Sequence, residues 1–91
     1  MEVPVELKRR YLDRRILELS HLRHLLDLDD YSEALRVGHQ VKGNAQTFDL
    51  PEIVPYGIAI ENAAKIKNKE EIQFQISRME HALQDARELV R

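Results

Sequence analysis

The chain has 91 residues, the size of one small domain, with 43% apolar and 33% charged residues, a balance that excludes a disordered chain and fits a mostly helical globular domain. The net charge of −2, from 14 basic and 16 acidic residues, argues against a nucleic-acid binder, which needs surplus Lys and Arg to neutralise phosphates. The absence of cysteine excludes a disulfide framework, a thiolate nucleophile and a cysteine zinc site.

The first predicted helix covers residues 4–28. Its apolar residues recur at steps of three and four, which places them on one stripe: Leu12, Ile16, Leu19, Leu22 and Leu26. Asp29 and Asp30 end the pattern and are suited to cap the next element. No apolar run approaches the roughly 20 residues of a membrane span, and residues 1–10 lack the apolar core of a signal peptide.

The second predicted helix covers residues 31–48. Its inward stripe is expected to consist of Tyr31, Leu35, Gly38, Val41, Ala45 and Phe48. A short turn of Asp49, Leu50 and Pro51 follows, and Pro51 suits the first position of a new helix, where a backbone donor is not needed.

The third and fourth predicted helices complete the chain. The third covers residues 51–67, with Pro55 expected to bend or delay its start and with an inward side of Leu50, Ile53, Gly57, Ile60 and Ala64. Asn68 and Glu71 resemble a capping box at the start of the fourth helix. That helix extends to about Val90, with one face formed by Ile72, Ile76, Met79, Leu83, Ala86 and Val90.

Four amphipathic helices with short connections predict an all-α fold, an antiparallel up-down-up-down four-helix bundle that forms a single domain over residues 1–91. No β-branched alternating run is flanked by turn residues, so no strand is expected. A bundle of this kind is a scaffold, and function must come from residues that the bundle does not need.

His39 is the residue of the second helix that stands out. At about 100° per residue it lies about 120° from Ala45, at the edge of the core and open to solvent. Lys42 and Gly43 lie on the next turn beside it, and Gln46 follows two turns away on the same line. Gly43 points outward although glycine inside a helix costs about 1 kcal/mol relative to alanine. We interpret Gly43 as clearing the surface beside His39 for another protein's backbone.

These residue types suit phosphoryl transfer. A neutral imidazole has a free nitrogen lone pair near pH 7, and an exposed nitrogen can form and break a bond to a phosphoryl group. Lys42 can place positive charge near the phosphoryl oxygens. The other ring nitrogen is expected to be held by an acceptor that fixes the tautomer.

The run His39-Gln40-Val41-Lys42-Gly43-Asn44-Ala45 closely resembles the signature of histidine-containing phosphotransfer (HPt) domains. The resemblance extends more loosely over the whole chain. It implies an exposed phosphorylated His39 on the second helix, with Lys42 assisting the phosphoryl group and Gly43 admitting the partner. It also implies that Glu61, on the third helix, bonds the imidazole.

The resemblance further implies a set of partners and no kinase activity of the chain's own. His39 would exchange its phosphoryl group with the aspartate of a response-regulator receiver domain, and a hybrid histidine kinase is a further partner of the same pathway. The receiver would supply Mg²⁺, so no cofactor is expected on this chain. A cytoplasmic monomer is the expected form, since one bundle can bury all four stripes.

Three residues depart from the family pattern. Asp49 stands where the family often has Gly, and Asp tolerates a left-handed backbone less well than Gly. Asn44 is larger than the usual Ser or Ala, and Gln46 replaces a residue that is often small. Gln46 is placed either to bond a phosphoryl oxygen or to crowd the receiver, so the departures bear on partner choice more than on fold.

Other interpretations remain open at this point. A helical module could bind a receiver or regulator without transferring phosphate. A metal centre would need more ligands than Glu18 and His21 with His24, and His81 is read as a surface residue. Glu61 could instead be a surface acid paired with Lys65. The basic cluster of the first helix is read as a solvated face with a weak docking role: Lys8, Arg9, Arg10, Arg14 and Arg15.

Overall fold

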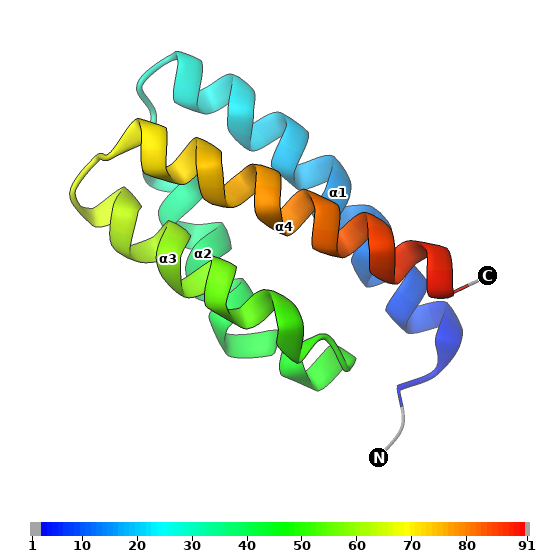
Figure 1. Cartoon of the computed structure of the whole chain (residues 1–91). Helices are drawn as coiled ribbons and strands as arrows, with labels where there is room; N and C mark the ends of the chain where they lie inside the picture. Colours follow the sequence, from blue (N-terminus) through cyan, green and yellow to red (C-terminus); the bar gives the residue numbers. More distant parts are fainter. Residues whose placement is uncertain (1–2, 91) are drawn as a thin grey trace.

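A computed structural model of the chain describes residues 3–90, and within that range the secondary structure is entirely helical. Figure 1 shows two long helices beside two shorter ones. The α-helices are α1 (Val5–Asp27), α2 (Ser32–Asn44), α3 (Val54–Lys65) and α4 (Lys69–Leu89). Two short 3₁₀ helices, η1 (Gln46–Phe48) and η2 (Pro51–Ile53), lie between α2 and α3.

The most extensive helix contact is that of α2 with α3, and α4 packs to a similar extent against α3 and against α1 (Figure 1). Two ion pairs connect α1 to α4 along their length. Arg87, near the end of α4, contacts Asp13 in the first half of α1, while Arg23, near the end of α1, contacts Glu80. Residue numbers therefore rise along one helix as they fall along the other.

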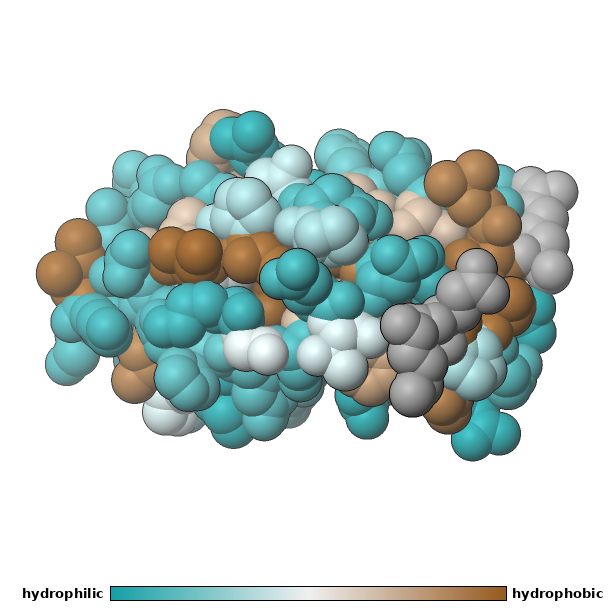
Figure 2. Space-filling model, turned by 90° about the horizontal axis from the view of Figure 1, so that it is seen from below, coloured by the Kyte–Doolittle hydropathy of each residue, from teal (hydrophilic) through white to brown (hydrophobic). Residues whose placement is uncertain are grey.

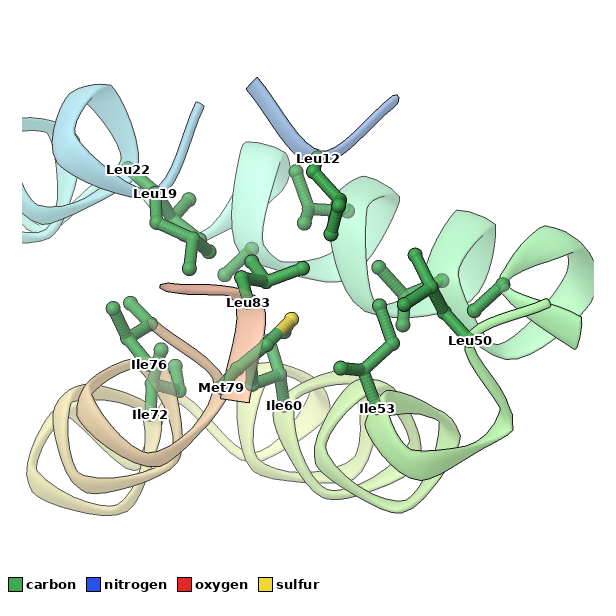
Figure 3. Packing of buried hydrophobic residues seen from close by; sticks show 14 of the residues in the cluster. Leu12, Leu19, Leu22, Leu50, Ile53, Ile60, Ile72, Ile76, Met79 and Leu83 are labelled. Carbon is green, nitrogen blue, oxygen red and sulfur yellow. The ribbon is translucent and has the colours of Figure 1, made fainter. Parts of the chain in front are cut away.

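The core is formed by the apolar stripes that the sequence predicts. Figure 3 shows leucine and isoleucine side chains of α1, α3 and α4, together with Leu50 and Ile53 from the segment before α3, pointing into one common interior. From α2 the core receives the smaller side chains of Ala34, Val37 and Val41. In α4 the whole predicted face is buried, and in the third-helix segment so are all five predicted inward residues. Burial of each large aliphatic side chain contributes about 1.5–3 kcal/mol, so these stripes are the main source of cohesion.

The predicted stripe of the second helix is wrong at Leu35. Its side chain is 39% exposed, and α2 instead buries Ala34 and Val37 together with Gly38 and Val41. The direction in which α2 faces is set by its close contact with α3, which turns the small Ala34 inward. Ala34 and Leu35 are adjacent and both fit the periodic pattern, so the prediction of Leu35 as the inward residue depends on its larger apolar side chain and not on its position.

The second helix also ends earlier than predicted. The α-helix ends at Asn44, with a last α-helical hydrogen bond from the amide of Ala45 to the carbonyl of Val41. The chain then tightens into η1 before Asp49 adopts a left-handed conformation with φ of 61°. The amide of Leu50 then donates to the carbonyl of Ala45, which closes the helix end. Asp49 thus occupies a backbone position that favours glycine.

The third helix begins later than predicted, because the chain forms η2 first and α3 starts only at Val54. Pro55 then lies in the first turn, where a missing amide donor is tolerated, as expected for a proline that delays the start of a helix. The capping box at residue 68 is half confirmed. The Asn68 side chain accepts a hydrogen bond from the Glu71 amide, while the Glu71 carboxylate accepts one from Gln75.

The outer surface is mostly charged or polar, with exposed apolar side chains scattered among the polar ones. Figure 2 shows one such face, which is largely hydrophilic with apolar patches between the polar groups. None of the helices in residues 3–90 combines the length and apolar character that crossing a membrane requires.

Candidate functional site

The site begins with the close approach of α2 to α3, which Gly38 makes possible. A Cβ atom added at Gly38 would lie 2.6 Å from the backbone nitrogen of Glu61 and 2.7 Å from the carbonyl oxygen of Gly57. Real Cβ atoms are not found that close to backbone atoms, so only glycine allows the two helices to touch here. The contact places the backbone of Glu61 directly against α2, the helix that carries His39.

His39, next in the chain after Gly38, projects outward from α2 with 70% of its side chain exposed. Its Nδ1 lies 2.7 Å from Oε2 of Glu61. The carboxylate beneath it is only 6% exposed. The ring is therefore held from below by a buried acceptor while its other edge faces solvent.

Lys42 occupies the second oxygen of the same carboxylate. Its Nζ donates to Oε1 of Glu61 at 2.7 Å, and its side chain is 40% exposed. One buried carboxylate thus joins the imidazole and the ammonium group, each through a separate oxygen. This arrangement fixes both groups relative to α3.

These contacts keep Glu61 ionised at neutral pH. The hydrogen bond from Lys42, followed by that from His39, lowers the pKa of the Glu61 carboxyl below its ordinary value. An ionised carboxylate can only accept hydrogen bonds, so the proton of a neutral His39 ring belongs on Nδ1. Nε2 is then the ring nitrogen with a free lone pair, and it lies on the solvent side.

The interpretation of Glu61 as a surface acid paired with Lys65 does not hold. Its carboxylate is buried, and its hydrogen bonds go to His39 and Lys42, whereas Lys65 acts on it only at longer range and as the smallest cause of the lowered pKa. The predicted imidazole-bonding contact of Glu61 is thus present in the geometry.

Gly43 and Gln46 occupy different positions relative to this cluster. Gly43 is exposed, and a Cβ atom added there would meet nothing within 4 Å outside its own helix backbone and chain neighbours. Gln46 is also exposed, but it lies in η1, beyond the end of α2. The structure therefore brings His39, Lys42 and Glu61 together, leaves open surface at Gly43, and sets Gln46 apart.

The residues considered for metal binding have other surroundings. Glu18 forms ion pairs with Arg15 and with Arg36, and His21 is exposed. His24 and His81 are also exposed. Within residues 3–90, no three His, Asp or Glu side chains converge on one point.

Sequence reasoning missed Arg15. The sequence predicts that it belongs to a solvated basic face, but its side chain is only 2% exposed and lies between α1 and α2. Its Nη1 donates to Glu18 and, at 3.4 Å, to Oε1 of Gln40. The available signal was its spacing, because Arg15 lies four residues before Leu19 and seven before Leu22, on the predicted inward stripe.

Fold and site together define a class of protein, a small all-helical module that presents a histidine on a helix surface, backed by a buried carboxylate and flanked by a lysine. The chain matches the family model of the Hpt domain over residues 6–89, nearly its whole length, and it belongs to that family. Members of the family act in histidine phosphotransfer in phosphorelay signalling, as phosphocarriers rather than kinases, and interact with response-regulator receivers. No curated protein and no solved structure gives a significant match to the chain.

Proposed function

We propose that this chain is a phosphorelay intermediate that accepts a phosphoryl group on Nε2 of His39 and passes it to the aspartate of a response-regulator receiver domain, or takes it from that aspartate. The observation that carries the proposal is the Glu61 carboxylate, which contacts Nδ1 of His39 at 2.7 Å from a buried position. It leaves Nε2 as the exposed nucleophile.

The step is balanced without an added reactant. The lone pair of Nε2 attacks the phosphorus of the receiver's aspartyl phosphate, forming an N–P bond as the P–O bond breaks and the aspartate leaves as a carboxylate. The ring then carries a positive charge, with its proton on Nδ1. The ionised Glu61 favours that charge through its hydrogen bond, and the reverse step returns the neutral ring.

Lys42, Gly43 and Gln46 have supporting roles in the proposal. Lys42 places its ammonium group near the phosphoryl oxygens as negative charge gathers there, one turn from His39. Gly43 provides bare helix surface for the receiver backbone, which its open surroundings support. Gln46 contacts the docked receiver at the end of α2, because its position in η1 is exposed but separate from the carboxylate cluster.

The proposal includes the setting of the site. The scaffold is a single domain, a monomeric antiparallel up-down-up-down bundle, supported by the ion pairs Arg87–Asp13 and Arg23–Glu80, whose residues follow opposite orders along α1 and α4. The chain works in the cytoplasm without kinase activity of its own. The receiver contributes Mg²⁺ and its acidic pocket, and a hybrid histidine kinase is the source of the phosphoryl group.

The direct test is transfer of a labelled phosphoryl group. Receiver domains of the same cell are labelled with radioactive acetyl phosphate, freed of the donor and mixed with this protein. Wild type should acquire label that is stable in alkali and released by acid, as expected of phosphohistidine, and His39→Gln should acquire none. His21→Gln is the matched control and should be labelled like wild type, because His21 is an exposed histidine of α1.

The alternative is a helical module that binds a receiver and acts by occupancy alone. It predicts binding of a receiver by wild type and by His39→Gln with equal affinity, and no label on either protein. A wild type that remains unlabelled with every receiver of the cell would favour this alternative.

A further inference from the structure

The two sides of α2 are held in different ways. On the α3 side the backbones touch at Gly38, whereas α1 packs chiefly against α4 and reaches α2 through side-chain hydrogen bonds. The shortest of these hydrogen bonds goes to Asn44, the last residue of α2. Its Oδ1 accepts a hydrogen bond from the Tyr11 hydroxyl at 2.8 Å and a longer one from Nη2 of Arg15 at 3.5 Å.

The two donors are themselves fixed in place. The Tyr11 ring is buried and stacks on Phe48 of η1 with ring centroids 4.3 Å apart. The Arg15 guanidinium lies over the Tyr11 ring at 5.0 Å and also donates to Gln40. Both donors belong to α1, and Arg15 also donates to Glu18 of that helix, so their hydrogen bonds tie the end of α2 to α1.

The end of α2 is where this restraint acts. The last α-helical hydrogen bond runs from the amide of Ala45 to the carbonyl of Val41, and the chain changes to 3₁₀ geometry at Gln46. The last turn of a helix has fewer backbone hydrogen bonds than its interior and frays more easily. Lys42 and Gly43 belong to this last turn, so loosening there displaces the backbone of both and leaves Lys42 held only through its side-chain hydrogen bond to Glu61. His39 remains beside the backbone contact at Gly38 and keeps its own bond to Glu61.

We propose that Asn44, anchored by Tyr11 and Arg15, is a positioning residue of the phosphotransfer site that fixes Lys42 and Gly43 for the incoming receiver. The inference rests on the proposed function and deepens it. It gives a physical role to a residue larger than the Ser or Ala of the family pattern. A residue without a side-chain acceptor at position 44 would leave the Tyr11 hydroxyl, bonded at 2.8 Å, without this partner.

The test uses Asn44→Ala, Tyr11→Phe and, as the conservative rescue, Asn44→Asp, which keeps the shape and the acceptor oxygen. Each variant is assayed at a temperature where circular dichroism shows it fully folded, with the receiver that labels wild type fastest. Asn44→Ala should lower the transfer rate at saturating receiver about tenfold, less than the ~100-fold that a 1 Å misplacement can cause. Tyr11→Phe should act in the same direction, and Asn44→Asp should stay within about twofold of wild type.

Two further readouts separate positioning from a purely structural role. In the Asn44→Ala background, Lys42→Ala should lower the rate less than it does in wild type, because the lysine is already misplaced; independent effects would multiply. Amide hydrogen exchange should accelerate at residues 41–45, while the ¹⁵N shifts of the His39 ring remain as in wild type, since its contact with Glu61 is kept.

The outcomes distinguish this inference from the proposed function. Labelled wild type together with wild-type rates in Asn44→Ala and Tyr11→Phe would overturn the positioning role alone. Multiplicative effects of Lys42→Ala and Asn44→Ala would also overturn it. A wild type that is never labelled would overturn both the proposed function and the positioning role. Faster hydrogen exchange in Asn44→Ala would then show only that Asn44 stabilises the end of α2.

Discussion

The two helix pairs of this protein are held together by different means. The α2–α3 pair consists of short helices in backbone contact, and all three glycines of the chain lie in it: Gly38, Gly43 and Gly57. The α1–α4 pair consists of long helices without glycine, joined at the surface by the ion pairs Arg23–Glu80 and Arg87–Asp13.

This difference shows where geometry must be defined most closely. A carboxylate can hold an imidazole and an ammonium group at hydrogen-bond distance only when the two supporting helices cannot slide. Backbone contact through glycine provides that restraint, since it leaves no flexible side chain between the helices. Surface ion pairs tolerate movement, because solvent screens them and their side chains are long.

The largest effect should come from breaking the close contact. Gly38→Ala places a Cβ atom 2.6 Å from the backbone nitrogen of Glu61, so α2 and α3 must separate. We expect a loss of about 3 kcal/mol in the free energy of unfolding, at the upper end for overpacking, measured by urea denaturation. Phosphotransfer should fall as well, because Glu61 would move away from His39. A loss below about 0.5 kcal/mol would mean that the helices are not held by backbone contact.

Gly43→Ala is the matched change on the same helix, at a site where a Cβ meets nothing. The alanine should raise the free energy of unfolding by about 1 kcal/mol through helix propensity. At the same time it should weaken docking, since a methyl group would stand on the surface reserved for the receiver. The comparison of unfolding with receiver affinity checks this, and tighter receiver binding would contradict the role of Gly43.

The α1–α4 pair should be much less sensitive. Arg23→Ala removes the ion pair with Glu80, whose partners are partly exposed, and should lower the free energy of unfolding by about 0.5–1 kcal/mol. The loss should shrink further in high salt because exposed charges are screened. A loss as large as that of Gly38→Ala would remove the contrast between the two pairs.

At neutral pH Glu61→Gln should lose only the small stability that the ionised carboxylate contributes, because the amide oxygen can still accept from Nδ1 of His39 while Lys42 is released. The response to acid should differ more. The fold lowers the pKa of Glu61 below its ordinary value of 4.5, so the stability from its ionised form is complete above about pH 4.5 and is lost as pH falls through the lowered pKa. Urea titrations from pH 7 to 3 should show a shallower acid decline in Glu61→Gln, and equal slopes would contradict the assignment.

Much of the fold could be predicted from periodicity. Leu19, Leu22 and Leu26 repeat at helical spacing and are buried as expected, and the face of α4 is buried throughout. The failures have a common cause. In both cases the residue type outweighs the position on the helix. Leu35 is predicted to face inward because it is more apolar than its neighbour Ala34, and Arg15 is predicted to face outward because it is charged, although it lies on the apolar stripe.

The candidate site divides in the same way. His39, Lys42 and Gly43 lie on one helix, and the sequence predicts that they are neighbours because residues three and four apart are adjacent on a helix surface. The contact of Glu61 with His39 joins two helices, and it was expected only from the family resemblance. The network of Tyr11, Arg15 and Asn44 also joins two helices and was not expected at all.

The sequence by itself determined the helical class, the apolar stripes and the presence of a histidine, a lysine and a bare glycine side by side on α2, because each of these is a local property of a helix. Only the tertiary structure decided which way α2 faces, how deeply Glu61 and Arg15 are buried, and which donors they meet. Those features depend on how closely two helix backbones approach, and at Gly38 that distance is set by the absence of a single Cβ atom.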